Sequence, residues 1–526
     1  MATQFALCDL PELGGATSEV VMRYVLGFLC VCALGVTPLV GCSETTGDGG
    51  SGGSAGTGGS GGTGGMPECQ NPEDCDDGQE CTADVCADGM CEYTPLADGT
   101  ACDESNECTT GMCASGQCHT TAVQDGSPCA GETLNGNPRG GCYGGFCNFV
   151  PVSVTIGAKE VVFDYTTDRC DYYDFPDSTA HVVRADDGEL VLFAAVPSYR
   201  LSRGADFDSL QRVCDPPALV SADLRTPESY ENQEWLWTPY REGANWHVLI
   251  HNEFHDTTAP YPCRTGDPHS TNPCWYNSVT YAVSTDDARS FVKPGAPAHV
   301  VAPAPRLWVP PPPDAPYQRW YAEGYLAPSN IVHGPDDYYY TLFRAIPGWD
   351  LDLGGACLMR TKSLDEPASW RAWNGTDFSL PLTSPYVAGS DVQVCEFLEA
   401  PDGPMMHDVQ SLTYNAYLER YMAVGTWGAW VGDQYLCGIF FSLSLDLIHW
   451  SHTQLIAETI VWCDRAPDAP GLLEPVAIGY PSIIDHEDPT TNFEHPGRTP
   501  YLYYTRPNGG LDRDLVRVPL TFTLEE

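Results

Sequence analysis

The stretch that decides the fold begins at Glu323 and reads EGYLAPSNIVHGPDDYYYTLFR as far as Arg344. After a loop it continues as ACLMRTKSLDEPASW, from Ala356 to Trp370. Two apolar runs are joined by a Gly-Pro-Asp-Asp turn, and a third apolar run and a closing aromatic residue follow them. The pattern predicts one antiparallel unit of four strands.

A unit of this kind has apolar faces that it cannot bury alone, so it implies copies packed against it. A second copy spans residues 407–450, where Cys437 and Trp450 have the same spacing as Cys357 and Trp370. Weaker copies cover three further segments, residues 177–230, 234–291 and 480–523. We therefore predict an all-β fold built from five such units.

Composition agrees with this fold class. The chain has 526 residues, and its 44 Pro and 52 Gly are typical of a turn-rich β protein. Its 71 acidic residues outnumber the 25 basic ones, for a net charge of −46, which repels phosphate backbones and anionic lipid surfaces. We therefore expect no nucleic acid partner and no cofactor, and a chain that acts as a monomer. The acidity also suits the hydrated surface of an exported protein.

The N-terminal region carries an export signal. Residues 22–42 place one Arg before a short apolar run, which is typical of a signal peptide, and Met22 is the expected true start. Leu39-Val-Gly-Cys42 resembles a bacterial lipobox, which implies that Cys42 is lipidated and becomes the mature N-terminus. The resemblance implies a protein held by its lipid on the bacterial outer membrane or cell surface. The alternative is an ordinary secretory signal with a chance Cys.

Composition changes along the chain predict four segments. From Gly47 to Gly65 the residues are nearly all Gly, Ser or Thr, which makes a flexible tether. The expected divisions are a signal peptide at 1–41, a lipidated linker at 42–66, a Cys-rich region at 67–150 and the β units at 151–526.

The Cys-rich region holds 12 of the 24 cysteines within residues 69–147 and repeats with a period of 27. With so few large apolar residues, disulfides of roughly 2–4 kcal/mol each must stabilise it in an oxidising compartment. Zinc is the rival interpretation, but the region has only His119 and no Cys-x-x-Cys pair, so we expect no metal. The region resembles Cys-rich repeats of myxobacterial surface proteins and would serve as an adhesion module or a protease-resistant stalk.

The five units fit a five-bladed β-propeller. In such a ring the first strand of each blade starts, and the second strand ends, at one face beside the central axis. These positions give a set of candidate site residues. First-strand starts provide Asp177, Glu234, Glu323, Asn330, His407, Asp408 and Tyr480, and second-strand ends provide Arg200, Glu253, His255, Arg344, Trp427 and Arg506.

This set mixes carboxylates, histidines, arginines and aromatic rings, which is the mixture that a carbohydrate site needs. Carboxylates and Arg bind sugar hydroxyls, and aromatic faces stack on sugar C–H surfaces. We therefore expect a glycan or oligosaccharide as the partner. For each residue taken singly, the alternative is an ordinary structural hydrogen bond near the axis.

Residues 160–526 resemble the five-bladed superfamily of glycoside hydrolase families 43, 32 and 62, above all at Tyr338-Tyr-Tyr340 and Ser444–Trp450. The resemblance implies Asp177 as the catalytic base and Glu323 as the proton donor, with Gly324 leaving space for substrate. The family's further Asp is missing from the start of the second blade, and Glu253 would replace it. Pro328 follows Gly324 after three residues, where the family has Pro at once.

Two hypotheses follow. One is a surface-anchored glycoside hydrolase with paired carboxylates. The other is a non-catalytic carbohydrate-binding or adhesion module on a disulfide-rich stalk. Two carboxyls facing each other roughly 5–9.5 Å apart would favour hydrolysis.

The β units contain eight cysteines. A shared geometry, in which a loop that enters a unit faces the start of a third strand, pairs six of them. The predicted disulfides are Cys170–Cys214, Cys357–Cys395 and Cys437–Cys463, which leaves Cys263–Cys274 for the long loop of the second unit. The second unit, residues 234–291, closes on Ser284–Phe291, and this stretch resembles the Asp-box turn of sialidase-type propellers.

Overall fold

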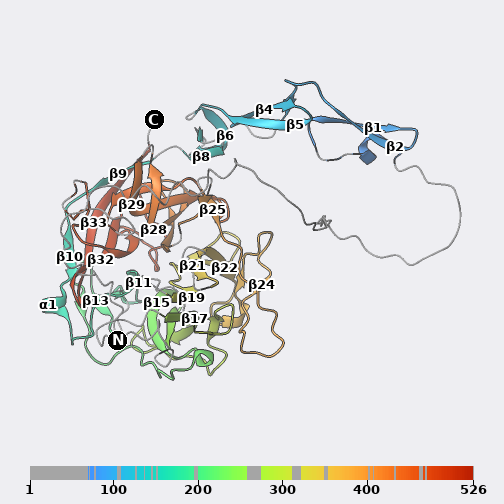
Figure 1. The fold of residues 1–526 in the computed structure, drawn as a ribbon. Coiled ribbons are helices and arrows are strands. Elements are labelled where there is room, and N and C mark those ends of the chain that lie inside the picture. Colours follow the sequence, from blue (N-terminus) through green and yellow to red (C-terminus); the bar gives the residue numbers. More distant parts are fainter. Residues whose placement is uncertain are drawn as a thin grey trace, which may run out of the picture. The chain divides into compact units, whose positions relative to one another are not determined.

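The computed structural model describes Cys69 and most of residues 71–524 (Figure 1). Within that range it leaves out residues 76, 78, 103–107, 125–126, 135–136, 144–145, 150–151, 195–198, 257–273, 311–320, 349–353, 401–402, 407, 432–433, 461–465, 468 and 470. The predicted signal peptide, the lipidation site and the tether lie outside the described residues, as do His407, Cys263 and Cys463. None of the helices in the described part is long and apolar enough to cross a membrane.

The described chain divides into two compact units between Pro95 and Leu96. The first contains η1 (Pro72–Cys75) and a hairpin of β1 (Thr82–Ala87) and β2 (Met90–Pro95). Disulfides Cys69–Cys86 and Cys75–Cys91 hold it together. Half of these strand residues are exposed, so the covalent links replace an apolar core.

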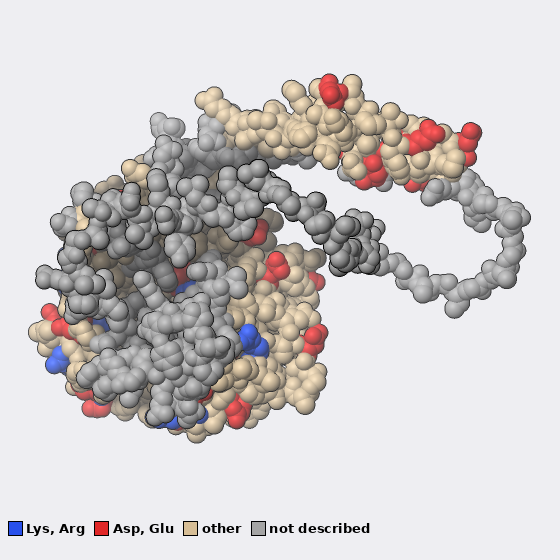
Figure 2. All heavy atoms as spheres, in the orientation of Figure 1, with Lys and Arg blue, Asp and Glu red and all other residues tan. Residues whose placement is uncertain are grey.

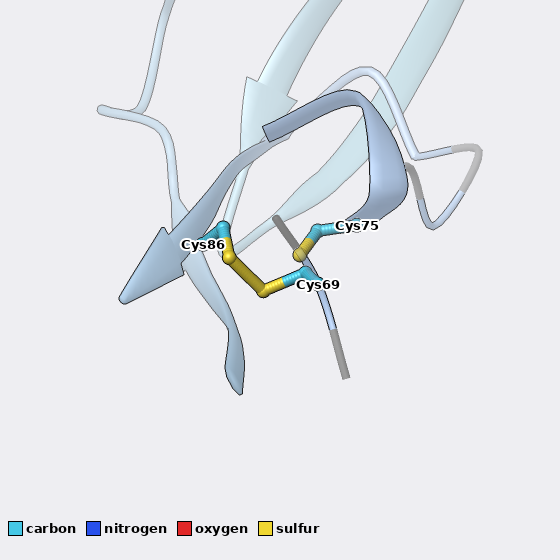
Figure 3. A group of neighbouring side chains, drawn as sticks. All are labelled: Cys69, Cys75 and Cys86. Atoms are coloured by element: carbon cyan, nitrogen blue, oxygen red, sulfur yellow. A yellow bond between two sulfur atoms is a disulfide. The ribbon is translucent and has the colours of Figure 1, made fainter. Parts of the chain in front are cut away.

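Three sulfur atoms in this unit, those of Cys69, Cys75 and Cys86, lie within 4.8 Å of one another (Figure 3). Such a cluster could bind zinc if the cysteines were thiolates. Figure 3 shows the bond from Cys69 to Cys86, and Cys75 is bonded to Cys91. In this oxidised form the cluster consists of disulfides rather than metal ligands.

The 27-residue repeat of the sequence is a repeat of structure. β4 (Thr109–Ala114) and β5 (Gln117–Ala122) form a hairpin in which Cys113 lies opposite Cys118 in the strand register. Cys86 lies opposite Cys91 in the same way in the first hairpin. The Cys102–Cys118 disulfide likewise spans 16 residues, as Cys75–Cys91 does. Further strands of this region are β3 (Ala101–Cys102), β6 (Pro128–Leu134), β7 (Asn137–Tyr143) and β8 (Phe146–Phe149).

The remainder is nearly all β-strand. The first repeat is a four-stranded antiparallel sheet. Its strands are β11 (His181–Arg184), β12 (Leu190–Phe193), β13 (Ser202–Gly204) and β14 (Gln211–Arg212). The short helix α1 (Tyr165–Asp168) precedes it, and η2 (Pro227–Ser229) follows it.

The second and third repeats share one ten-stranded sheet, because β17 pairs in parallel with β19. The second repeat contains β15 (Gln233–Glu242), β16 (Asn245–His255), β17 (Cys274–Ser284) and β18 (Val300–Ala302). The third contains β19 (Tyr321–Leu326), β20 (Val332–His333), β21 (Tyr339–Ile346), β22 (Gly355–Thr361), β23 (Arg371–Ala372) and β24 (Leu380–Pro381), with η4 (Pro367–Ser369) before β23.

The fourth repeat is a four-stranded sheet of β27 (Asp408–Asn415), β28 (Arg420–Val431), β29 (Gln434–Ser444) and β30 (Gln454–Glu458), after a small hairpin of β25 (Glu399–Ala400) and β26 (Gly403–Pro404). The fifth contains β31 (Gly479–Ile484), β32 (Tyr501–Gly509) and β33 (Asp512–Leu524). Its outer strands are β10 (Glu160–Phe163) and β9 (Val152–Ile156), which pair with β33. Two strands from the start of the β region therefore complete the sheet formed by its last strands. The sequence pattern does not predict this pairing.

The turns after the third strands of the second and fourth repeats both carry a Ser and, two residues later, an Asp, and the structure explains this repeated pattern. In the second repeat Ser284 Oγ accepts the amide of Ala288, and Asp286 Oδ1 accepts the amide of Ser290 at 2.9 Å. Ala288 has a φ of 56°, a left-handed conformation that glycine adopts more readily. Ser444 and Asp446 make the same kind of turn in the fourth repeat. Both turns therefore resemble each other in hydrogen bonds as well as in sequence.

Among the apolar clusters of the described residues, the five largest each join two repeats. Val183 of the first repeat packs in one cluster with Leu236 and Ile250 of the second. Equivalent clusters join the second repeat to the third, the third to the fourth and the fourth to the fifth. The fifth cluster joins Val182 of the first repeat to Tyr503 of the last.

Candidate functional site

Asp177 lies just before the first strand of the first repeat and is almost fully buried. Its Oδ1 atom pairs with Arg513 Nη1 and accepts a hydrogen bond from the Tyr480 hydroxyl at 3.1 Å. Both partners come from the fifth repeat. Burial raises the pKa of Asp177 to about 6, although the charge of Arg513 opposes this rise.

Glu253 lies near the end of β16 and is also buried. His255 Nε2 donates a hydrogen bond to its Oε2 atom at 2.8 Å, and His251 Nε2 is 3.8 Å from its Oε1 atom. The three side chains alternate with their neighbours along one strand and therefore share a face. Burial alone would raise the pKa of Glu253, but the hydrogen bond from His255 and the charges of both histidines lower it overall.

The two carboxyl groups act on each other electrostatically. The negative charge of Glu253 is one of the causes that raise the pKa of Asp177. The pKa of Asp177 is therefore raised while that of Glu253 is lowered. Two carboxyls shifted in opposite directions hold different protonation states at mildly acidic pH, between about 4.5 and 6, and are both mostly ionised at neutral pH.

Aromatic rings surround this pair. Trp235, Trp237 and Tyr480 form one buried cluster with Ala327, and Trp237 lies edge-on to both His251 and Tyr480. These residues come from β15, from the third repeat and from β31, so the first strands of several repeats meet here. We name Asp177, Glu253, His251, Arg513, Tyr480 and Trp237, with His255, the axial cluster.

Glu323 lies in the middle of β19 and has no exposed surface. Its Oε2 atom forms an ion pair with Arg306 Nε at 2.9 Å. Burial raises the pKa of Glu323 to about 7, against the lowering effect of Arg306. Without the charge of Arg306 the pKa of Glu323 would be raised further.

Strand register relates Glu323 to the axial cluster. Tyr276 pairs with Glu323, whereas Asn277 pairs with both Gly324 and Glu253. Because successive side chains point to opposite faces of a strand, Glu323 shares a face with Tyr276 and Glu253 shares one with Asn277. The link between the two runs through Asn277, whose side chain donates to the Glu323 carbonyl at 3.0 Å and accepts from His251 at 3.0 Å.

Gly324 is required by this link. It has a φ of +106°, and a Cβ atom there would lie 2.0 Å from the carbonyl oxygen of Asn277. The missing side chain of Gly324 lets β19 approach β17, while the expectation that it also leaves space for substrate stays a prediction.

Three of the candidate binding residues are engaged with one another or with the scaffold. Arg344 Nη1 lies 3.6 Å from Asp408 Oδ1, and Thr426 donates to the other oxygen of Asp408. Asn330 Oδ1 accepts from the amide of Leu412 and from the hydroxyl of Ser411. Asn330 thus joins the third and fourth repeats.

The remaining candidates lie in other surroundings. Arg200 pairs with Asp171 and donates to the Cys214 carbonyl. Arg506 pairs with Asp514 at 2.7 Å, and Trp427 packs half-buried against the core between the third and fourth repeats. Of the candidates from the sequence, His255 and Tyr480 are hydrogen-bonded to the candidate carboxyls of the axial cluster, Glu253 and Asp177 respectively.

Sequence reasoning missed His251, Asn277, Arg513 and Trp237. His251 carried a usable signal, because it alternates with Glu253 and His255 in one strand. Trp237 carried another, since Trp235 and Trp237 alternate in β15 in the same way. Arg513 had no local signal, because its partner Asp177 is 336 residues away.

Two of the four disulfides named from the sequence lie within the described residues. Cys170 is bonded to Cys214 and Cys357 to Cys395. Cys274 and Cys437 are also disulfide-bonded, and their expected partners lie outside the described residues. Cys357–Cys395 joins the third strand of the third repeat to the segment before the fourth repeat, whereas Cys170–Cys214 joins the segment before the first strand of the first repeat to the segment just after its fourth strand.

No protein-family model and no curated protein matches the chain. Among solved structures, a protein of unknown function from Dyadobacter fermentans is similar at 11% identity, over 70% of this chain and 99% of that one, with a TM-score of 0.38. An α-L-arabinanase from Cellvibrio cellulosa is similar at 12% identity, over 65% and 90%, with a TM-score of 0.34. A GH43_1 enzyme from Xanthomonas citri, complexed with xylotriose, is similar at 11% identity, over 69% and 90%, with a TM-score of 0.38. Identities this low carry over no activity.

Proposed function

We propose that the β repeats form a five-bladed β-propeller that binds a glycan beside its axis and hydrolyses it. Two observations support the ring. Each core cluster joins one repeat to the next, and the fifth cluster joins the last repeat to the first. Strands β9 and β10, from the start of the β region, pair with β33 in the final sheet, which is how a propeller closes its ring.

The loop between β31 and β32 also supports a ring of five repeats. Oxygen atoms of this loop accept hydrogen bonds from backbone amides at the inner strand ends of the other four repeats. Its acceptors are Thr491 O for Arg184, Asn492 Oδ1 for Arg241, Glu494 Oε2 for His333 and Glu494 O for Tyr414. One short loop can reach four strand ends only if those ends gather around a common axis.

The observation that carries the activity is the placement of two buried carboxyls whose charges interact: Asp177 beside Arg513 and Tyr480, and Glu253 beside His255. We assign Asp177, with a pKa of about 6, as the base, since it is mostly ionised at neutral pH. We assign Glu323, with a pKa of about 7, as the proton donor. Glu253 raises the pKa of Asp177 toward the working range through its charge.

The surroundings suit a sugar. Every hydrogen bond and ion pair of Asp177 within the described residues goes to Oδ1, so Oδ2 is available to a ligand hydroxyl or water. Trp237 Nε1 is buried and has no hydrogen-bond partner among the described residues. The rings of Trp235, Trp237 and Tyr480 supply apolar faces.

The test is a screen of chromogenic glycosides and of a glycan array with the full-length protein, purified in detergent. Hydrolysis of a glycoside that Asp177→Asn and Glu323→Gln both abolish would support the assignment. Glu228→Gln is the matched control, since Glu228 is an exposed glutamate away from the axial cluster. Turnover that survives both site variants would contradict it.

A non-catalytic glycan-binding module is the second candidate, and one observation favours it. Glu323 shares a strand face with Tyr276 and pairs with Arg306, whereas Glu253 shares the other face with Asn277. If the two faces do not converge on one sugar ring, the site would bind without cleaving. Glycan binding that Asp177→Asn weakens, with no turnover on any glycoside, would identify this case.

We further propose that the chain is a surface lipoprotein, anchored through Cys42 by the lipobox Leu39–Cys42. Replacement by Cys42→Ala should move the protein from the membrane fraction to the soluble fraction. Cys32→Ala, within the apolar run, is the control and should leave the protein in the membrane. Retention of the Cys42→Ala variant in membranes would exclude the anchor.

A further inference from the structure

A polar hollow lies on the third repeat, formed by the hairpin of β21 and β22 together with the segment after it. It encloses about 350 Å³, a size found for small-molecule sites. Arg360, Lys362 and Arg371 line it, with Glu366 as its one carboxylate. Three cations against one carboxylate leave a net charge of +2.

This charge is unusual for the chain, which has 25 basic and 71 acidic residues. On the face drawn in Figure 2, acidic atoms are scattered over the described surface and basic atoms stand in a few separate spots. Three cations in one hollow are therefore more than the low proportion of basic residues in the chain would lead one to expect. Asp336 lies 3.4 Å from Arg360 and offsets one of them, and the balance stays positive.

Two of these cations have no carboxylate partner in the described part of the chain. Lys362 makes one contact, with its Nζ atom 4.5 Å from the centre of the Tyr338 ring. Arg371 donates to the carbonyl oxygens of Ala368 and Trp370. Arg360 lies directly opposite Arg371 in the pairing of β22 with β23, and like charges at such positions destabilise a sheet. An anion between them would remove that cost.

Aromatic rings hold the central guanidinium in place. Arg360 lies 3.9 Å from the centre of the Tyr338 ring and 4.2 Å from that of Phe378. The Tyr340 hydroxyl accepts a hydrogen bond from its Nη1 atom at 3.0 Å. A guanidinium fixed by its faces presents its remaining N–H groups at the edge, ready to bind an oxyanion.

Hydroxyl groups of Thr361, Ser363 and Ser369 complete the lining. Those of Thr361 and Ser369 hydrogen-bond to each other and to the Ser363 carbonyl, so they offer a ligand their remaining lone pairs. Cations and hydroxyls together suit a saccharide that carries an anionic group, since the cations bind the charge and the hydroxyls bind sugar hydroxyls. We propose that this hollow binds the carboxylate or sulfate group of an acidic saccharide. The choice of a saccharide rests on the proposed glycan-binding function, whereas the choice of an anion rests on the hollow alone.

The test measures binding of trigalacturonate to the full-length protein by calorimetry at low salt. Its methyl ester is the neutral control, and a sulfated galactan oligosaccharide distinguishes sulfate from carboxylate. Trigalacturonate or the sulfated oligosaccharide should bind, the methyl ester should not, and added salt should weaken binding.

The variant Lys362→Gln should weaken this binding by about tenfold, the usual scale for one charge-assisted hydrogen bond. Lys362→Arg should largely restore it. Arg225→Gln, which removes an exposed cation elsewhere, is the matched control and should change nothing. Because Lys362 is exposed, its replacement should leave the melting temperature unchanged.

Absence of binding to either anionic probe, equal binding of the methyl ester, or an unchanged affinity of Lys362→Gln would each overturn the proposal. The axial function is separable. If Asp177→Asn abolishes binding or cleavage of another glycan while the anionic probes fail to bind, the hollow proposal alone fails. If Lys362 governs binding of the anionic probes but no glycan depends on Asp177, the proposed axial function fails and the hollow stands.

Discussion

Asp177 and Arg513 form a buried ion pair between residues 336 positions apart in the sequence. Both side chains are almost fully buried, so each is the main compensation for the charge of the other. The pair joins the entrance of the first repeat to the last strand of the β region. It therefore serves the closure of the fold and the candidate site at once.

Arg513→Met should destabilise the protein by about 3–5 kcal/mol, because it leaves the buried carboxylate of Asp177 without its cationic partner. Urea unfolding followed by tryptophan fluorescence measures the change. The double variant with Asp177→Asn should recover part of the loss. Arg225→Gln removes a largely exposed ion pair with Asp223 and should stay within about 0.5 kcal/mol of the native protein. A loss below about 1 kcal/mol for Arg513→Met would show that the pair does not close the fold.

The repeats themselves could be predicted, because strand-forming patterns are local. The equal spacing of Cys357 to Trp370 and Cys437 to Trp450 reflects third strands that end in similar turns and close on buried Trp rings. Hydrophobic alternation and turn residues are enough to find such elements.

Pairings between distant parts could not be predicted in this way. Nothing in the sequence near β10 indicates that it pairs with β33, and nothing near Asp177 indicates Arg513. Gly324 shows the same limit at short range, since its reason is the approach of a strand 47 residues earlier, at Asn277. Identity of the candidate carboxyls was accessible from the sequence, but their partners were not.

Glu323→Gln should reduce turnover by roughly 100-fold or more while glycan binding is kept, because glutamine has the same shape and cannot donate the proton. Initial rates and a binding isotherm on the same glycoside separate the two effects. Glu228→Gln should behave like the native protein. Equal rates for Glu323→Gln and the native protein would remove Glu323 from the chemistry.

The same variant should flatten the dependence of stability on pH. The pKa of Glu323 is raised from 4.5 to about 7, so its contribution to folding is fully present below pH 4.5 and is lost as pH rises through about 7. Between pH 4.5 and 8 the native protein should lose on the order of 2–4 kcal/mol more than Glu323→Gln does. Urea unfolding at a series of pH values gives this difference. Parallel curves for the two proteins would mean that Glu323 has an ordinary pKa.

Peptide mapping under non-reducing conditions should recover Cys170–Cys214 and Cys357–Cys395, and it should also recover the predicted Cys263–Cys274 and Cys437–Cys463. Each bridge closes a loop that would otherwise gain conformational freedom on unfolding. Fragments that link a cysteine of residues 69–147 to one of these eight would contradict the pairing.

Glu253→Gln should move the acidic limb of the pH–rate profile. In the native protein kcat/KM should rise as Asp177 loses its proton near pH 6 and fall as Glu323 loses its proton near pH 7. The charge of Glu253 is one cause of the raised pKa of Asp177, so removing that charge makes ionisation of Asp177 easier. The acidic limb should therefore shift below pH 6, while the alkaline limb stays in place. Glu228→Gln should leave both limbs unchanged. An acidic limb that stays fixed or moves upward in Glu253→Gln would separate Glu253 from Asp177, and the assignment of Asp177 as the base would lose its electrostatic support.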